Sequence, residues 1–205
     1  MKKRFFTIIL VFFVVLFFII FIKNNYKKNK FGNNENNKSV IDIETYILNI
    51  SSYKATMDVT INSNKNTNKY IMEQECNFKN NYRKQTIIEP ENIKGIEIIS
   101  ENGNVEIKNS KLNLNEMYKE YPHVSENMLW LESFIKEYSE DGAQKNIYED
   151  QNYIIMELKE EKNKYFSTRK LYIDKKTASP KKMVVQGNDK KEAIYILYNE
   201  IIINY

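Results

Sequence analysis

The sequence has few of the residues that form covalent crosslinks, sharp turns or catalytic sites. Its 205 residues include one cysteine, one histidine, three prolines and five glycines. A single cysteine excludes an intrachain disulfide, a thiolate zinc site and a CxxC redox pair. A single histidine, His123, leaves a Ser-His-Asp triad or a multi-histidine metal site without its other members. The low content of proline and glycine argues against a low-complexity protein.

Acidic side chains are plentiful, but they do not mark a catalytic pair. Several glutamates occupy alternating positions of expected strands, where we expect them to face solvent: Glu73, Glu75, Glu97, Glu101 and Glu106. A glycosidase acid needs an apolar environment that raises its pKa, and these positions provide none. The phosphate-binding motifs GxGxxG and GxxxxGKS are also absent. We therefore expect a non-enzymatic chain with no cofactor and no metal site, although the carboxylate count alone leaves a paired-carboxylate enzyme open.

Positive charge is concentrated at one end of the chain. The formal net charge is +4, but residues 1–30 contain seven Lys or Arg and no acid, so the remainder is slightly acidic. Binding to nucleic acid requires a basic surface, and the larger part of the chain lacks that surplus. We therefore expect no nucleic-acid partner.

One long apolar run precedes the polar part of the chain. Residues 5–22 read FFTIILVFFVVLFFIIFI, with Thr7 the only polar residue. This length is near the ~20 residues that cross a hydrocarbon core, and neither a small-residue cleavage site nor a lipid-accepting cysteine follows. We predict a signal anchor, one transmembrane helix, over residues 1–22 and a solvated Asn/Lys-rich linker over 23–38. Lysines flank both ends of the run, so charge alone does not set its orientation.

From residue 39 onward the pattern is that of an antiparallel sheet. Ser39 is placed to cap a short amphipathic helix over residues 40–50, and Asn102-Gly103 is a strong signal for a tight hairpin. Alternating apolar and polar residues predict about nine strands, and the short loops between them indicate antiparallel pairing. The expected strands are residues 53–61, 70–78, 82–88, 96–99, 105–107, 153–159, 164–174, 182–186 and 193–203.

The main helix is marked by a change in the spacing of apolar residues, from every second residue to every third or fourth. From Ser125, a suitable N-cap, apolar residues recur at three- and four-residue spacing towards Gly142, which offers a stop. The stripe consists of Met128, Leu131, Phe134, Ile135 and Tyr138, and Leu129 and Trp130 widen it. We expect this helix to cover the core. His123, in the loop before the helix, is interpreted as a surface or helix-entry residue, and Cys76 as a small core hydrophobe.

The stretch LYIDKKTASPKKMVVQ, residues 171–186, together with AIYILYNEIII after it, resembles the LolA-like lipoprotein-carrier superfamily. There a strand ends in an Asp-x-x-Thr-x-x-Pro turn, and Asp174, Thr177 and Pro180 occupy those positions here. The segments ISSYKATMDVT and SENMLWLESFIKEYSE add a resemblance to clostridial germination lipoproteins of the GerS type. The resemblance implies an α+β fold over residues 39–205. This is a curved antiparallel sheet, an incomplete β-barrel, covered by one main helix and a short N-terminal helix.

The same resemblance implies a function. It points to a non-enzymatic protein on a single-pass anchor in the cell membrane, with its C-terminal domain outside the cytoplasm. There it would partner a cortex cell-wall amidase in sporulation or germination. GerS itself is anchored through a lipidated cysteine, whereas this chain has an apolar run instead.

The alternative is a LolA-like carrier or binder of acyl chains or lipoproteins. Such a protein would hold its ligand in an apolar trough, and the candidate trough residues are Met57, Val59, Met72, Trp130 and Phe134. The last strand is apolar on both sides, so it is either buried on both faces or extended to meet a partner. A homodimer is a further possibility that the sequence leaves open.

Overall fold

The computed structural model describes residues 39–120, 127–161 and 163–205. These residues belong to one compact unit, Lys38–Tyr205. The predicted anchor over 1–22, the predicted linker over 23–38, Ser125 and His123 lie outside the described residues. Within the part of the chain that is described, no helix has both the length and the apolar character needed to cross a membrane.

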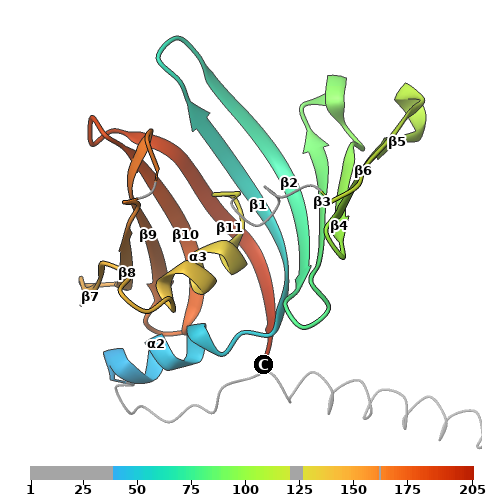
Figure 1. Cartoon of the computed structure of the whole chain (residues 1–205). Helices are drawn as coiled ribbons and strands as arrows, with labels where there is room; N and C mark the ends of the chain where they lie inside the picture. The colour runs from blue at the N-terminus through green and yellow to red at the C-terminus, as the bar shows by residue number, and fades with distance from the viewer. Residues whose placement is uncertain (1–38, 121–126, 162) are drawn as a thin grey trace, which may run out of the picture. The chain divides into compact units, whose positions relative to one another are not determined.

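An eleven-stranded sheet dominates the described residues (Figure 1). Its order is β6-β5-β4-β3-β2-β1-β11-β10-β9-β8-β7, and every neighbouring pair is antiparallel. The strands are β1 (Ser52–Asn62), β2 (Thr67–Asn77), β3 (Tyr82–Glu89), β4 (Glu97–Glu101), β5 (Asn104–Asn109), β6 (Leu114–Tyr118), β7 (Lys145–Glu149), β8 (Tyr153–Lys159), β9 (Phe166–Asp174), β10 (Ser179–Gly187) and β11 (Glu192–Asn204). Because β6 and β7 are the two ends of this order, the sheet is curved but does not close into a barrel.

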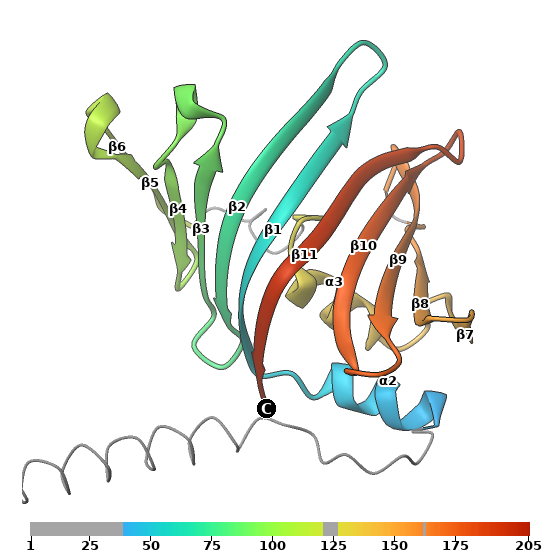
Figure 2. The ribbon, with the colours of Figure 1, turned by 180° about the vertical axis from the view of Figure 1, so that it is seen from behind.

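Two α-helices of the described residues accompany the sheet. The helix α3 (Leu131–Tyr138) lies against the concave face, and α2 (Val40–Leu48) lies beneath the ends of β8–β10, in contact with β7 and β8. Seen from behind, β1, β10 and β11 lie in front of α3, and no described helix covers this convex face (Figure 2). The expected curved sheet with a main helix and a short first helix is therefore present.

Local chemistry explains why these segments fold as the sequence indicated. Ser39 and Asp42 form a capping box at the start of α2, in which each side chain accepts a hydrogen bond from the other residue's backbone N–H. Asn102 and Gly103 both have positive φ, +51° and +80°, as a tight hairpin between β4 and β5 requires. Asp174 Oδ1 accepts from the backbone N–H groups of Lys176 and Thr177, which fixes the turn between β9 and β10.

The main helix is shorter than predicted. The sequence suggested a helix from Ser125 to Gly142, but α3 spans only Leu131–Tyr138. Before it, the Asn127 side chain accepts from the backbone of Leu129, and the chain turns instead of continuing the helix. Trp130 is then extended, with φ −94° and ψ 127°, at the N-cap position. Met128 and Leu129, which the sequence placed on the helix, instead lie in the turn before α3 and pack against the core from there.

Two strands were missed, because they do not show the expected alternation. Only the first residue of β6, Leu114, is half-buried, and the other four are exposed. The strand β7 is likewise mostly exposed. Both are edge strands, held by backbone pairing to a single neighbour, so neither needs a buried side of apolar residues. The predicted count of about nine strands is therefore too low.

Candidate functional site: the concave face beneath helix α3

The five candidate trough residues all lie in the hydrophobic core. Met57 and Val59 on β1, and Met72 on β2, point to the concave side, where Trp130 and Phe134 meet them from α3 and its N-cap. Each of the five has at most 4% of its surface exposed. The concave face therefore has an apolar floor, and the chain's own side chains cover these five residues. Whether a ligand can displace them stays a prediction.

Polar residues share this face with the apolar floor. Arg83 on β3 and Arg169 on β9 both point inward, with 5% and 0% of their surface exposed. They are the only arginines after residue 4 in the whole sequence. Four strands separate β3 from β9 in the sheet, so the two side chains reach α3 from opposite sides.

Arg83 forms a two-point ion pair with Glu132 of α3. Its Nε lies 2.5 Å from Glu132 Oε2, and its Nη2 lies 2.8 Å from Oε1. The Sγ of Cys76, from β2, lies 3.4 Å from the same Oε2. Burial, helped by the nearby charge of Glu132, raises the pKa of the Cys76 thiol. Cys76 is therefore a protonated core residue, as the sequence predicted, and not a reactive thiolate.

Arg169 joins three acceptors on the other side of α3. Its guanidinium donates to Glu160, to Glu137 at 2.6 Å and to the hydroxyl of Ser133 at 3.1 Å. Burial raises the pKa of the Glu160 carboxyl, and the charge of Arg169 opposes that shift. Because Ser133 and Glu137 belong to α3 while Glu160 follows β8, this cluster ties the helix to the sheet.

A chain of neutral hydrogen bonds lies near the Arg83 pair. The hydroxyl of Tyr53 donates to Gln74 Oε1, and Gln74 Nε2 donates to Gln85 Oε1 and to the backbone carbonyl of Leu129. The hydroxyl of Tyr198 is buried without a hydrogen bond, and burial raises its pKa. The concave face is thus polar in its flanks and apolar in its floor.

This arrangement is suited to holding a helix in place and not to proton transfer. Each guanidinium is engaged by carboxylates, and each carboxylate of the two clusters has an arginine partner. No group of three or more potential metal ligands occurs among the described residues. Moving α3 away from the sheet would leave several charges buried without partners, which is strongly unfavourable. The concave face is therefore closed by a helix with specific attachments.

Sequence reasoning missed the two ionic clusters, although a signal was present. Arg83 alternates with Gln85 and Ile87, and Arg169 with Leu171 and Ile173, so both occupy the inward side of their strands. In a chain that otherwise uses lysine, two arginines at inward positions indicate buried pairing, because a guanidinium can satisfy two acceptors at once.

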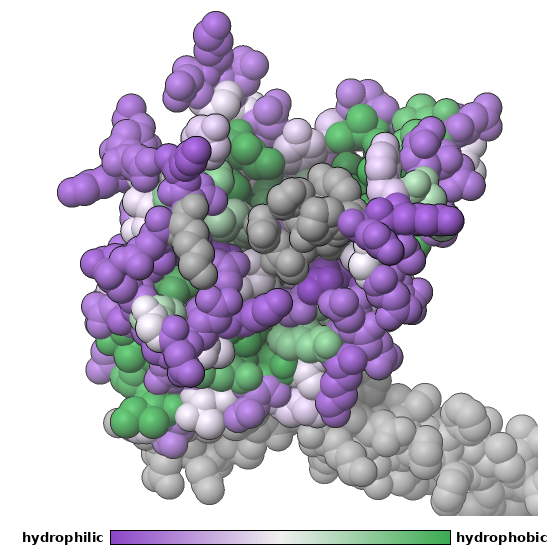
Figure 3. Space-filling model, viewed as in Figure 1, coloured by the Kyte–Doolittle hydropathy of each residue, from purple (hydrophilic) through white to green (hydrophobic). Residues whose placement is uncertain are grey.

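The surface on the α3 side is chemically mixed. Outside the undescribed residues, hydrophobic patches are interrupted by hydrophilic side chains (Figure 3). Among the most exposed large apolar residues of the described chain, Leu112, Met117 and Tyr118 lie on β6 or in the turn just before it. The others lie on separate elements and loops: Ile41, Tyr165, Ile202 and Tyr205.

Comparison with known proteins supports the fold. No family model and no curated protein matches the chain. Its structure is similar to an uncharacterized conserved protein from Thermus thermophilus, with a TM-score of 0.52 and 9% identity over 80% of this chain and 85% of that one. It is also similar to a chain in the complex of the CwlD amidase from Clostridioides difficile with the GerS lipoprotein. That match has a TM-score of 0.50 and 20% identity, and covers 83% of this chain and 98% of the other.

A LolA superfamily protein from Nitrosomonas europaea aligns with a TM-score of 0.41 and 9% identity, over 82% of this chain and 94% of that one. The similarity to a chain of the GerS complex agrees with the fold that the sequence resemblance implied. At these identities the likeness concerns the fold alone.

Proposed function

We propose that this chain is a membrane-anchored, extracytoplasmic interaction protein that binds a cell-wall amidase, in the manner of GerS and in sporulation or germination. The observation that carries the proposal is the structural likeness to a chain in the complex of GerS with the CwlD amidase, which extends over 83% of this chain. The apolar run at residues 5–22 supports the anchor, and the absence of a lipid-accepting cysteine beside it favours a transmembrane segment over a lipid.

The closed concave face supports a partner protein over a carrier. A carrier must expose its apolar floor to a ligand, and here α3 is attached across that floor through Glu132 and Glu137. Opening would have to break both attachments at once. A protein that acts through its outer surface needs no such opening, so the same attachments suit a rigid binding module.

The test is direct binding of the full chain, in detergent micelles or nanodiscs, to the purified cell-wall amidase of the same organism. We expect saturable binding, and no hydrolysis of peptidoglycan by the chain alone. An anchored domain of unrelated fold, prepared in the same way, is the control. Absence of binding to any amidase of that organism would overturn the proposed partner. Size measurement of the same sample tests whether the chain forms a homodimer, which the sequence left open.

Location is tested separately with protoplasts. A protease added outside should degrade residues 39–205 if the domain lies outside the cytoplasm. A cytoplasmic protein serves as the control for intact membranes. Full protection of the domain would contradict the proposed orientation and would leave the binding test unaffected.

A further inference from the structure

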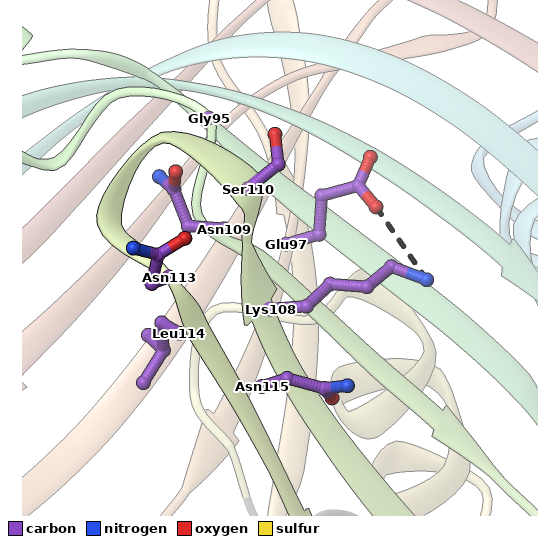
Figure 4. A pocket seen from close by; sticks show the side chains of 8 residues that line it. All are labelled: Gly95, Glu97, Lys108, Asn109, Ser110, Asn113, Leu114 and Asn115. Atoms are coloured by element: carbon purple, nitrogen blue, oxygen red, sulfur yellow. Dashed lines mark ion pairs between the residues drawn. The ribbon is translucent and has the colours of Figure 1, made fainter.

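A hollow lined mainly by residues of polar type lies at one end of the sheet, away from α3. It has a volume of about 610 Å³ and is lined by β4, β5 and β6, by the turn before β4 and by the turn between β5 and β6 (Figure 4). Its lining residues are Gly95, Glu97, Lys108, Asn109, Ser110, Asn113, Leu114 and Asn115. The volume is within the range of about 300–1,000 Å³ that is typical of small-molecule sites.

One buried side chain holds the wall of this hollow in place. Asn109 is 3% exposed, and its Oδ1 accepts from the backbone N–H groups of Lys111 and Leu112 at 2.9 and 3.2 Å. Its Nδ2 donates to the backbone carbonyl of Lys94 at 2.9 Å. The carboxamide thus joins the turn before β4 to the turn before β6. Gly95, beside it, has a φ of +80°, which favours glycine. The hollow is a defined feature of the fold.

The charges at the hollow neutralise one another. Glu97 lies 3.9 Å from Lys108 Nζ (Figure 4). Glu97 also lies 2.5 Å from Lys84 Nζ, and Lys108 Nζ lies 3.4 Å from Glu106. The ammonium of Lys108 is therefore shared by two carboxylates and is poorly placed to attract an anion. The hollow has no surplus of either sign that would select a phosphate or a cation.

The remaining side chains are neutral and available. Ser110, Asn113 and Asn115 are exposed, and their side chains make no hydrogen bond to any described residue. A carboxamide presents both donors and an acceptor, and a hydroxyl presents both as well. Leu114 supplies the one aliphatic side chain of the lining. A single apolar residue is too little for an acyl chain, which must bury most of its surface.

These properties fit a ligand that is neutral and rich in hydroxyl and amide groups. We propose that the hollow binds an N-acetylated glycan, with Asn113, Asn115 and Ser110 as its hydrogen-bonding side chains. A sugar hydroxyl both donates and accepts, as these three side chains do, and its ring carbons can pack on Leu114. That the glycan is a cell-wall strand rests on the proposed function, because only an extracytoplasmic domain would meet one.

The test uses the full chain and a tetramer of N-acetylglucosamine as the probe, with affinity measured by calorimetry. Asn113 has a φ of +50°, so Asn113→Gly removes the carboxamide and retains the backbone conformation. We expect Asn113→Gly and Asn115→Ala each to weaken binding about threefold to tenfold, which corresponds to the loss of one hydrogen bond. Asn68→Ala, at an exposed strand position outside the hollow, is the matched control and should bind as the wild type does.

Two results would overturn the inference. One is the absence of tetramer binding by the wild-type chain, and the other is equal affinity of the wild type, Asn113→Gly and Asn115→Ala. A free stem peptide of the cell wall is tested in parallel, and binding of the peptide in place of the tetramer also counts against a glycan site. Amidase binding is measured on the same samples. If the wild-type chain does not bind the amidase, the proposed function is contradicted. The tetramer measurement tests only the glycan site, so the two failures can be told apart.

Discussion

The two faces of the sheet use different basic residues for different purposes. On the concave face, Arg83 and Arg169 are buried and paired with carboxylates. On the convex face, the next residues along the same strands, Lys84 and Lys170, remain partly exposed and pair with glutamates of neighbouring strands. One step along a strand changes the side chain from arginine to lysine, because successive side chains point to opposite faces.

The difference teaches what each set of charges contributes. A buried ion pair loses much of its attraction to desolvation, so it adds little net stability, but removing one partner is costly. An exposed pair contributes about 0–1 kcal/mol. The arginines therefore specify where α3 lies, while the lysines keep an uncovered face soluble. The following variants test this contrast.

The largest effect is expected for Arg169→Ala. The variant leaves the carboxylates of Glu160 and Glu137 without their shared cation, and Glu160 is itself buried. We expect the free energy of unfolding to fall by an amount near the upper end of about 3–5 kcal/mol. Lys170→Ala, one residue away on the convex face, is the control and should cost less than about 1 kcal/mol. Chemical denaturation measures both, and equal losses would contradict the proposed division of roles.

A somewhat smaller effect is expected for Arg83→Ala, because only one carboxylate, Glu132, loses its partner. We expect a loss of about 3 kcal/mol. Arg83→Lys sharpens the test, since an ammonium keeps the charge but cannot form the two parallel hydrogen bonds of the guanidinium. Arg83→Lys should therefore recover only part of the loss. Full recovery in thermal or denaturant unfolding would show that charge alone is needed.

The sequence predicted most of the sheet because several of its inner strands, such as β1, β3 and β9, alternate between buried and more exposed residues. In β1, Tyr53, Met57 and Val59 are buried while Lys54 and Asp58 are not, and this contrast is visible without a structure. The expected helix over 40–50 and the Asn-Gly hairpin were equally readable, since a cap and a turn are local features.

The parts that escaped prediction depend on long-range pairing. The edge strand β6 is held by backbone hydrogen bonds to β5, which leave no pattern in its own side chains. The ionic clusters join residues far apart in the chain, such as Arg83 with Glu132; local alternation places the arginine inward, but it does not identify the partner carboxylate. The hollow beside β6 depends on Asn109, whose tertiary bond to Lys94 is likewise invisible in the sequence.

Substituting a neutral residue of the concave face should cost an amount of stability between the costs expected for the buried arginines and for the exposed lysines. Gln85 Oε1 accepts the hydrogen bond of the buried Gln74, so Gln85→Leu would leave the Gln74 amide without this partner. We expect a loss of about 2 kcal/mol, within the range for an unsatisfied buried donor. Thr86→Ala, the next residue and on the convex face, should change stability by no more than about 0.5 kcal/mol. If Gln85→Leu and Thr86→Ala lost similar free energies of unfolding in urea, the two faces would not differ for uncharged residues.

The smallest effect is expected on the convex face itself. Lys84 Nζ lies 2.5 Å from Glu97, but both side chains keep about 30% of their surface exposed, so water and salt screen the pair. We expect Lys84→Ala to cost less than about 1 kcal/mol at low salt, and the difference from the wild type to shrink as salt is raised to about 1 M. Arg83→Ala, from the opposite face of the same strand, should retain most of its loss under the same conditions, because a buried pair is screened much less. A salt response of equal size in both variants, measured by urea unfolding at several salt concentrations, would mean that the two faces do not differ in the way their charges act.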